Sequence, residues 1–336
     1  MLDLSTLKKI DSKGMFETYD KWPQFARDAY ESQVDPITFD DIDHIVFSGM
    51  GGSGAIGDLF SAILSKTNIH VNVVKGYVLP KTVDKNTLVV TTSISGDTSE
   101  TLSILQSAAK MDCKSISFSS GGKMKLFCEK NNTLFREIPK IHSPRASFVT
   151  FAYSILHSLN SILPIQKNHV MESLDKLDEQ SEKISSENLN DNISINLANF
   201  LHNQIPCIYY PNGLSAAAIR FKNSLQENSK THAFIEDVIE ACHNGIVSWE
   251  NPSKICPVLI KGTDDHIKTK ERWSILEEYF DSKKIPYQEI NTVDGNILSK
   301  LVCLIHLLDF SSIYLAVLSG IDPSPVKSID FVKTRL

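Results

Sequence analysis

The sequence predicts an α/β protein with two tandem, doubly wound domains whose sheets are mainly parallel. Three observations predict this fold class. Short apolar runs typical of buried strands alternate with runs typical of helices, and loops rich in glycine, serine and threonine follow two of the apolar runs. The second half of the chain repeats the order of strand, small-residue loop and helix found in the first half. Such alternation favours parallel sheets whose ligand loops lie at the carboxyl ends of the strands.

In the first half, apolar runs that are predicted to form strands are each followed by a polar or glycine-containing segment. The runs are residues 44–48 (HIVFS), 70–74 (HVNVV), 87–94 (TLVVTTSI) and 115–120 (SISFSS). Helices are predicted to follow the first run, over DLFSAILSK, the third run, within SGDTSETLSILQSAAKM, and the fourth run, over KMKLFCEKN.

The middle of the chain, residues 148–202, is expected to be helical. It begins with the apolar-faced run FVTFAYSILHSLNSIL and continues into MESLDKLDEQSEKISSENLN, which is polar enough for an exposed helix and a linker. We place the domain boundary inside that polar segment. The prediction is therefore an N-terminal domain over residues 1–175 and a C-terminal domain over residues 176–336.

The second half repeats the order of elements predicted for the first half. IPCIYY (205–210) is a predicted strand that leads into a small-residue loop and a helix, as HIVFS does. ICPVLIKGTDD (255–265) parallels TLVVTTSISGD, with a strand, a polar loop that contains glycine, and then a helix. A short strand (IPYQEIN) and a long apolar helix (LVCLIHLLDFSSIYLAVLSG) complete the pattern.

Composition indicates a soluble cytoplasmic protein. Of 336 residues, 42% are hydrophobic and 22% charged, which is the balance of a globular protein. The net charge of −6 and the dispersed basic residues predict no nucleic-acid partner. We expect no membrane partner, because no apolar run approaches the ~20 residues that span a bilayer and the first residues lack a signal-peptide pattern. The six cysteines show no C-x-x-C spacing, so buried free thiols are expected rather than disulfides.

The glycine-rich loop GMGGSG matches G-x-G-x-x-G at Gly49, Gly51 and Gly54, between a strand and a helix. This is the context of a dinucleotide fingerprint, which also requires an acidic residue at the end of the second strand. That strand ends in Val74 and Lys75, so a nicotinamide cofactor is disfavoured. The structural alternative is that the glycines only permit a tight turn and close packing of helix on strand.

A second loop carries three hydroxyl groups just after a strand and before a helix: Ser93, Ser95 and Thr98. Unpaired N–H groups and the helix dipole stabilise an anion at such a helix start, and hydroxyl donors add hydrogen bonds without a permanent charge. The alternative is a plain N-cap, which needs one hydroxyl and no ligand. Three hydroxyls near a second glycine-rich loop favour a bound phosphate.

Together these motifs resemble a known family. GMGGSG followed by S-x-S-G-x-T-x-E-T resembles the sugar isomerase (SIS) domain, whose loops hold a sugar phosphate. With Pro144-Arg145, QENSK and HNGIVSWE in the same order, nearly the whole chain resembles the bifunctional phosphoglucose/phosphomannose isomerases of archaea and some bacteria. The resemblance implies a sugar-phosphate substrate, with the phosphate bound in the N-terminal domain by Gly51, Gly52, Ser53, Ser93, Ser95 and Thr98.

The same resemblance implies the catalytic groups of the C-terminal domain. Glu227 is expected to be the base that moves the proton between C2 and C1, although alone it could be an exposed glutamate paired weakly with Lys230. His243 is expected to help open the sugar ring, because the pKa of imidazole lies near the working pH. In related isomerases this histidine reaches the partner subunit's site, which implies a homodimer.

Two further cations complete the expected site. Arg145 would stabilise the enediolate; its alternative is a surface arginine after a proline turn, and Ala146 and Ser147 are a small departure from the family pattern. Lys333 is preferred to Lys327 as the ring-opening lysine, because it follows an apolar pair expected to anchor a helix. Isomerisation through an enediolate requires no cofactor, and the sequence has no H-x-H or H-E-x-x-H metal spacing, so neither cofactor nor metal is expected.

The expected activity is the interconversion of glucose 6-phosphate, and of mannose 6-phosphate, with fructose 6-phosphate. A non-catalytic SIS sensor is the rival from another class, but such regulators usually carry a DNA-binding helix-turn-helix, for which the N-terminus has no basic recognition helix. The isomerase half of an amidotransferase would need a glutaminase domain with a cysteine after Met1, where this sequence has Leu2.

Overall fold

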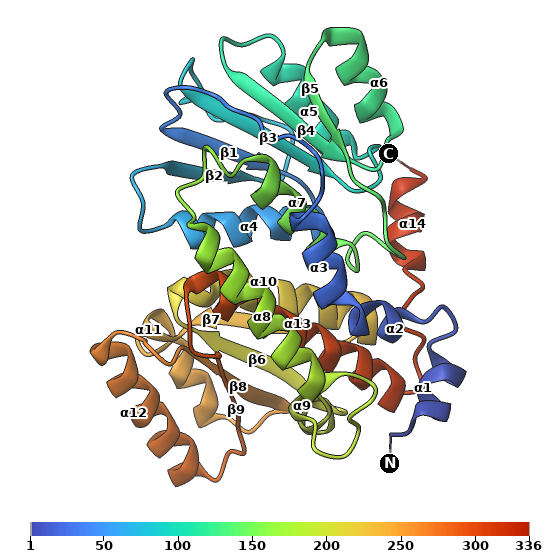
Figure 1. Cartoon of the computed structure of the whole chain (residues 1–336). Helices are drawn as coiled ribbons and strands as arrows, with labels where there is room; N and C mark the ends of the chain where they lie inside the picture. Colours follow the sequence, from blue (N-terminus) through green and yellow to red (C-terminus); the bar gives the residue numbers. More distant parts are fainter. Residues whose placement is uncertain (1, 336) are drawn as a thin grey trace. The chain divides into compact units, whose positions relative to one another are not determined.

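The computed structural model describes residues 2–335, which group into two compact units. The N-terminal unit is Lys21–Leu174, and the C-terminal unit combines Met1–Asp20 with Asp175–Leu336. The division falls inside helix α8 (Lys167–Ile184), a continuous helix that belongs to both units (Figure 1).

The first twenty residues group with the C-terminal unit, whereas the predicted first domain, 1–175, included them. Their contacts explain the difference. The Tyr19 carbonyl lies 2.9 Å from Nε2 of His306, which is fully buried in the C-terminal unit. The Ser12 hydroxyl donates to the Asp322 carboxylate at 2.6 Å. Long-range contacts of this kind leave no pattern in the local sequence.

The N-terminal unit is a doubly wound sheet with helices on both faces. Its five strands are all parallel, in the order β2-β1-β3-β4-β5. The elements after α3 (Trp22–Tyr30) are β1 (His44–Ser48), α4 (Gly52–Leu64), β2 (His70–Val74), β3 (Thr87–Ser93), α5 (Ser99–Ala108), β4 (Lys114–Ser119), α6 (Gly122–Asn131), β5 (Leu134–Glu137) and α7 (Phe148–Ser158). The four predicted strands are confirmed, and β5 was missed because it is an edge strand of only four residues, none of them buried.

The strand order places a topological switch point between β1 and β3. The chain moves from β1 to β2 on one side and from β3 through β4 to β5 on the other. Figure 1 shows α4 and α7 on one face of this sheet and α5 and α6 on the other. The loops after β1 and β3 therefore emerge side by side at one edge, which is where open α/β sheets bind ligands.

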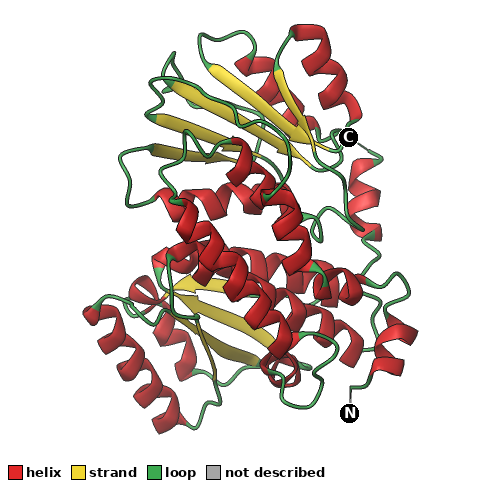
Figure 2. Ribbon diagram, viewed as in Figure 1, coloured by secondary structure: helices red, strands yellow, loops and turns green. Residues whose placement is uncertain are grey.

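The C-terminal unit repeats this plan with four parallel strands in the order β7-β6-β8-β9, drawn in yellow in Figure 2. Besides α1 (Leu4–Ile10) and α2 (Met15–Asp20), it contains α9 (Ile193–Leu201), β6 (Ile205–Tyr210), a 3₁₀ turn (Asn212–Leu214), α10 (Ser215–Ser224), a π-helical turn (Leu225–Ser229), β7 (Phe234–Asp237), α11 (Val238–Ala241), a second 3₁₀ turn (Gly245–Glu250), β8 (Ile255–Lys261), α12 (Ile267–Lys283), β9 (Gln288–Asn291), α13 (Ile297–Leu318) and α14 (Lys327–Lys333). The two-domain α/β fold class is confirmed.

Helix α13 is the core of the C-terminal unit. By length and composition it could cross a bilayer, so the expectation that no apolar run approaches such a length was wrong. In the structure, 94% of its apolar window is buried against the rest of the protein. The helix packs on α9, α10 and the π turn. It also carries buried polar residues, which must find partners inside the unit.

Candidate active site

The two predicted phosphate loops meet at the switch point of the N-terminal unit. Ser48 pairs with Thr91 in the parallel register, so β1 and β3 end at neighbouring positions. The buried Ser53 hydroxyl then accepts a hydrogen bond from the N–H of Ile94 at 3.2 Å. The glycine-rich loop and the hydroxyl loop are therefore joined directly.

The hydroxyl loop is internally ordered. The hydroxyls of Ser93 and Thr98 lie 2.9 Å apart, and that of Ser93 also accepts from the Gly96 N–H at 3.1 Å. Ser95 is exposed and accepts from the Asp97 N–H. Thr98 is the N-cap residue of α5 but makes no side-chain capping bond. The plain N-cap interpretation therefore does not describe the Thr98 side chain, which points to Ser93 instead.

Gly96 gives this loop its shape. Its φ of +77° is in the left-handed region. A Cβ placed there would come within 2.7 Å of the carbonyl carbon of Gly121 and closer still to the carbonyl oxygen. Only glycine lets the hydroxyl loop pack this closely on the turn that precedes α6.

Arg145 lies next to the glycine-rich loop. An ideal Cβ at Gly52, the first residue of α4, would be 3.2 Å from the Arg145 Cα. Arg145 is only 5% exposed, so it is not the surface arginine of the alternative interpretation. A buried arginine whose main chain lies beside the glycine-rich loop favours binding of an anionic substrate.

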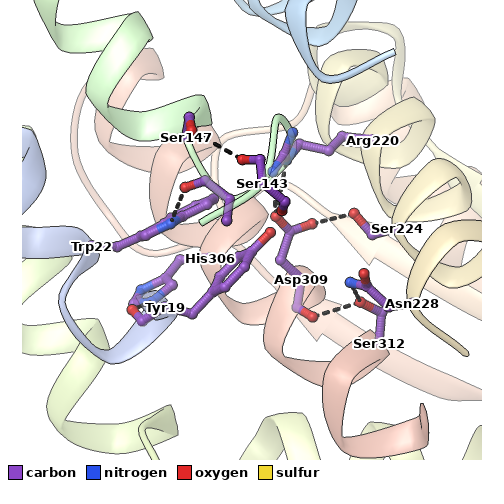
Figure 3. Close-up of polar contacts among 11 residues, drawn as sticks. Tyr19, Trp22, Ser143, Ser147, Arg220, Ser224, Asn228, His306, Asp309 and Ser312 are labelled. Atoms are coloured by element: carbon purple, nitrogen blue, oxygen red, sulfur yellow. Dashed lines mark hydrogen bonds and ion pairs between the residues drawn. The ribbon is translucent and has the colours of Figure 1, made fainter. Parts of the chain in front are cut away.

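The turn that carries Arg145 is fixed by buried small residues. The Trp22 indole donates to the Ala146 carbonyl at 2.9 Å, and the Ser147 hydroxyl donates to the carbonyls of Ile141 and Ser143 (Figure 3). Ala146 and Ser147 are fully buried. Side chains as small as these are what the buried turn accommodates.

Glu227 lies on the π-helical turn that extends α10. Such turns are rare and occur frequently at functional sites. Glu227 is half buried, while Asn228 and Ser229 beside it are buried. The turn ends at Lys230, whose φ of +58° is left-handed and whose N–H returns to the Leu225 carbonyl.

Lys230 connects the π turn to the C-terminal tail. Its ammonium donates to the Glu227 carbonyl and to the carbonyls of Pro323 and Pro325, the latter at 2.8 Å. Lys230 is therefore more than the weak surface partner of the Glu227 side chain that the alternative described. Lys230 places the start of the tail beside the turn that carries Glu227.

The tail forms helix α14, with Lys327 at its start and Lys333 at its end. Both lysines are exposed. The expectation that the apolar pair anchors the helix was wrong, since Phe331 is 60% and Val332 54% exposed. The choice of Lys333 over Lys327 therefore remains a prediction.

His243 is exposed and follows α11 in a tight turn. Its N–H donates to the Glu240 carbonyl, and the Asn244 side chain accepts from the Gly245 N–H. A Cβ at Gly245 would collide with the Glu236 carboxylate on β7. Burial raises the pKa of Glu236. The histidine is thus presented to solvent by a compact, constrained turn.

Sequence reasoning missed a buried ion pair between Arg220 of α10 and Asp309 of α13. The Nη2 of Arg220 lies 2.6 Å from the Asp309 carboxylate, and the side chains are 3% and 0% exposed. Burial is the largest single effect and acts to lower the pKa of Arg220. The charge and hydrogen bond of Asp309, with smaller contributions from Tyr19 and Glu227, together raise the pKa above its ordinary value. A lone aspartate within an apolar helical run was the available signal.

The equivalent loop of the C-terminal unit differs chemically. After β8 the chain presents Asp264 and Asp265 where the N-terminal unit presents hydroxyls. Asp265 accepts from the Gly262 N–H at 3.0 Å, and Asp264 pairs with Lys300 at 2.5 Å. Two carboxylates disfavour a phosphate there.

Comparison with known proteins agrees with this architecture. Residues 38–157 match the SIS domain, and residues 190–336 match the bacterial phospho-glucose isomerase C-terminal SIS domain. A bifunctional phosphoglucose/phosphomannose isomerase of Caldicellulosiruptor bescii is 34% identical over 96% of this chain and 98% of its own length. A protein of the same name from Aquifex aeolicus is 31% identical over 87% and 90%. In fold, a hypothetical protein from Thermus thermophilus superposes with a TM-score of 0.77 at 15% identity, over 98% of this chain and 92% of that one. The chain belongs to the bifunctional phosphoglucose/phosphomannose isomerase family.

Proposed function

We propose that this sugar-phosphate isomerase interconverts glucose 6-phosphate, and also mannose 6-phosphate, with fructose 6-phosphate. The observation that carries the proposal is the full-length similarity to relatives named for both activities, together with the hydroxyl loop at the switch point. The start of α5, uncapped by the Thr98 side chain, and the hydroxyls of Ser53, Ser93, Ser95 and Thr98 bind the phosphate, with the main chain of Gly51 and Gly52.

The bound sugar is then isomerised by groups of opposite charge. Glu227 takes the proton from C2 of the open-chain sugar and returns it to C1. Arg145 stabilises the enediolate oxygens between the two transfers, because a guanidinium keeps its charge and can fork to two oxygens. Lys333 assists ring opening. Mannose 6-phosphate is accommodated if the C1–C2 unit rotates above the same carboxylate.

His243 opens the ring in the site of a second copy of this chain. The support from the structure is the exposure of His243 and of three large apolar side chains within nine residues of it in the sequence: Phe234 is 53%, Ile239 40% and Val247 60% exposed. Apolar surface of this kind is typical of a protein interface. A homodimer in the cytoplasm is therefore the proposed working form.

The activity is tested by incubating the protein with each hexose 6-phosphate and measuring fructose 6-phosphate. Glu227→Gln is expected to lower kcat on the order of 10³-fold, since a general base contributes about 10²–10⁴-fold. Glu278→Gln is the matched control, because Glu278 is an exposed glutamate of α12. Wild-type rates in Glu227→Gln would refute the role of this carboxylate.

The dimeric arrangement is tested by mixing two inactive variants. Consider a mixed dimer with one Glu227→Gln subunit and one His243→Asn subunit. Both substitutions fall in the same one of its two sites only if His243 acts in the partner subunit's site. Exchange of subunits would then create one intact site in each mixed dimer, and activity should return. If the mixture stays inactive although subunits exchange, His243 does not act in the partner subunit's site.

A non-catalytic sugar-phosphate sensor is the alternative from another class. It predicts that sugar phosphate binds, as measured by calorimetry, while no fructose 6-phosphate forms with any hexose 6-phosphate.

A further inference from the structure

The π turn that carries Glu227 requires support from outside its own helix. A π turn has i→i+5 hydrogen bonds in place of the α-helical pattern and is rare, so contacts from outside the helix are expected to stabilise it. Within the turn, the Ser229 hydroxyl donates back to the Leu225 carbonyl at 2.7 Å. Two polar side chains, one before and one after Glu227, point instead to helix α13 (Figure 3).

Two of these side chains bracket Glu227 in sequence. The Ser224 hydroxyl, three residues earlier, donates to Oδ1 of Asp309 at 2.6 Å. The Asn228 amide, one residue later, donates to the Ser312 hydroxyl at 2.8 Å. Asp309 and Ser312 lie three residues apart on α13, and therefore share one face of that helix.

The two anchoring points are connected to each other. The Ser312 hydroxyl donates to the main-chain carbonyl of Asp309 at 2.6 Å, which orients it to accept from Asn228. The second oxygen of Asp309 accepts from Nε and Nη2 of Arg220, at 3.0 and 2.6 Å. All five side chains in this network are at most 3% exposed. Buried groups paired in this way hold fixed positions, because breaking any of these hydrogen bonds leaves a buried polar atom without a partner and out of reach of water.

We propose that Ser224, Asn228, Asp309 and Ser312 are positioning residues for Glu227, and that Arg220 holds the Asp309 carboxylate at their centre. The inference rests on the proposed role of Glu227 as the base. Both ends of the turn are fixed to a buried helix, so the carboxylate between them is held in one place relative to the C-terminal unit. A displacement of about 1 Å is enough to cost on the order of 10²-fold in rate.

Ser312→Ala tests the proposal most cleanly. It removes the acceptor of Asn228 and leaves the Arg220–Asp309 pair intact, so the unit should still fold. Ser311→Ala is the matched control: Ser311 is the neighbouring buried serine of α13, and its hydroxyl donates to the Leu307 carbonyl. Ser224→Ala provides a second variant at the other end of the turn.

We expect kcat of Ser312→Ala and Ser224→Ala to fall at least about 10-fold, with KM within about twofold of wild type. The initial ratio of glucose to mannose 6-phosphate formed from fructose 6-phosphate should also change, because it depends on where the carboxylate lies. A smaller folded fraction lowers the rate but leaves this ratio unchanged. Ser311→Ala should keep both the rate and the ratio.

The proposal is overturned if Ser312→Ala and Ser224→Ala behave as Ser311→Ala does. It is equally overturned if they lose rate only in proportion to folded protein, with the product ratio unchanged. Failure of the proposed function looks different: the wild-type protein would form no product, or Glu227→Gln would remain active whatever the result at Ser312.

Discussion

Replacing Gly96 by alanine is expected to disable the phosphate loop while the N-terminal unit stays folded. The perturbation has two parts. A left-handed φ costs a residue with a Cβ about 1–2 kcal/mol, and Gly96 has a φ of +77°. The added methyl group would also lie 2.7 Å from the carbonyl carbon of Gly121, against an optimal carbon separation of about 3.5 Å.

The hydroxyl loop and the turn before α6 must therefore separate by at least about 0.8 Å, since the carbonyl oxygen of Gly121 lies closer still. That movement is transmitted to Ser93, because its hydroxyl accepts from the Gly96 N–H. The donors proposed to bind the phosphate would then be misplaced. We expect kcat/KM to fall on the order of 10²-fold, and competitive inhibition by inorganic phosphate to weaken.

Gly76→Ala is the control for this experiment. Gly76 follows β2 at the same edge of the sheet, has no left-handed φ, and its ideal Cβ meets no atom within 4 Å. Thermal unfolding of both variants separates loss of fold from loss of binding. If Gly96→Ala binds inorganic phosphate and turns over substrate as Gly76→Ala does, the conformation of the hydroxyl loop is not needed for phosphate binding.

Burial and close packing make three other properties of the chain testable. Burial lowers the pKa of His306 from 6.5 to about 4, so only the unfolded chain takes up its proton between these values. The free energy of unfolding should then fall by about 3 kcal/mol as the pH is lowered through this window. In urea unfolding experiments, His306→Gln should lack this part of the pH dependence. In the folded protein, iodoacetamide should modify only the half-buried Cys113 and Cys242, as detected by mass spectrometry. The other four cysteines are buried, and burial raises the pKa of three of them, Cys207, Cys256 and Cys303, to about 12. Gly245→Ala should lower kcat/KM for glucose 6-phosphate, measured as fructose 6-phosphate formed, because its Cβ would push against Glu236 and displace the His243 turn.

The sequence was sufficient for the fold class because the strands of a parallel sheet are continuous apolar runs. All residues of β1 and β3 are buried, and such runs are recognisable without any tertiary information. Strand β7 was missed for the opposite reason: it has four residues, lies at a sheet edge, and its first residue is exposed. Its identity as a strand depends on pairing with β6.

The candidate site divides in the same way. Ser53, Ser93 and Thr98 could be found from the sequence because they follow strands, and strand order alone brings their loops together. Glu227 follows a helix, and general principles gave no reason to select it; only the resemblance did. The π turn and its anchors on α13 join residues more than 80 positions apart, so no local pattern could indicate them.

The two units share one strand arrangement but differ in the residues of the loop at the switch point, and this difference accounts for the different roles proposed for them. Both sheets have a switch point, between β1 and β3 in one unit and between β6 and β8 in the other. The loop of the first unit carries hydroxyls, which are able to donate to a phosphate. The loop of the second carries Asp264 and Asp265, which are already occupied by Lys300 and a main-chain N–H and would repel an anion. With its switch point closed to phosphate in this way, the C-terminal unit can contribute through other parts of the same fold: the end of α10, where Glu227 lies, and the turn after α11, where His243 is exposed.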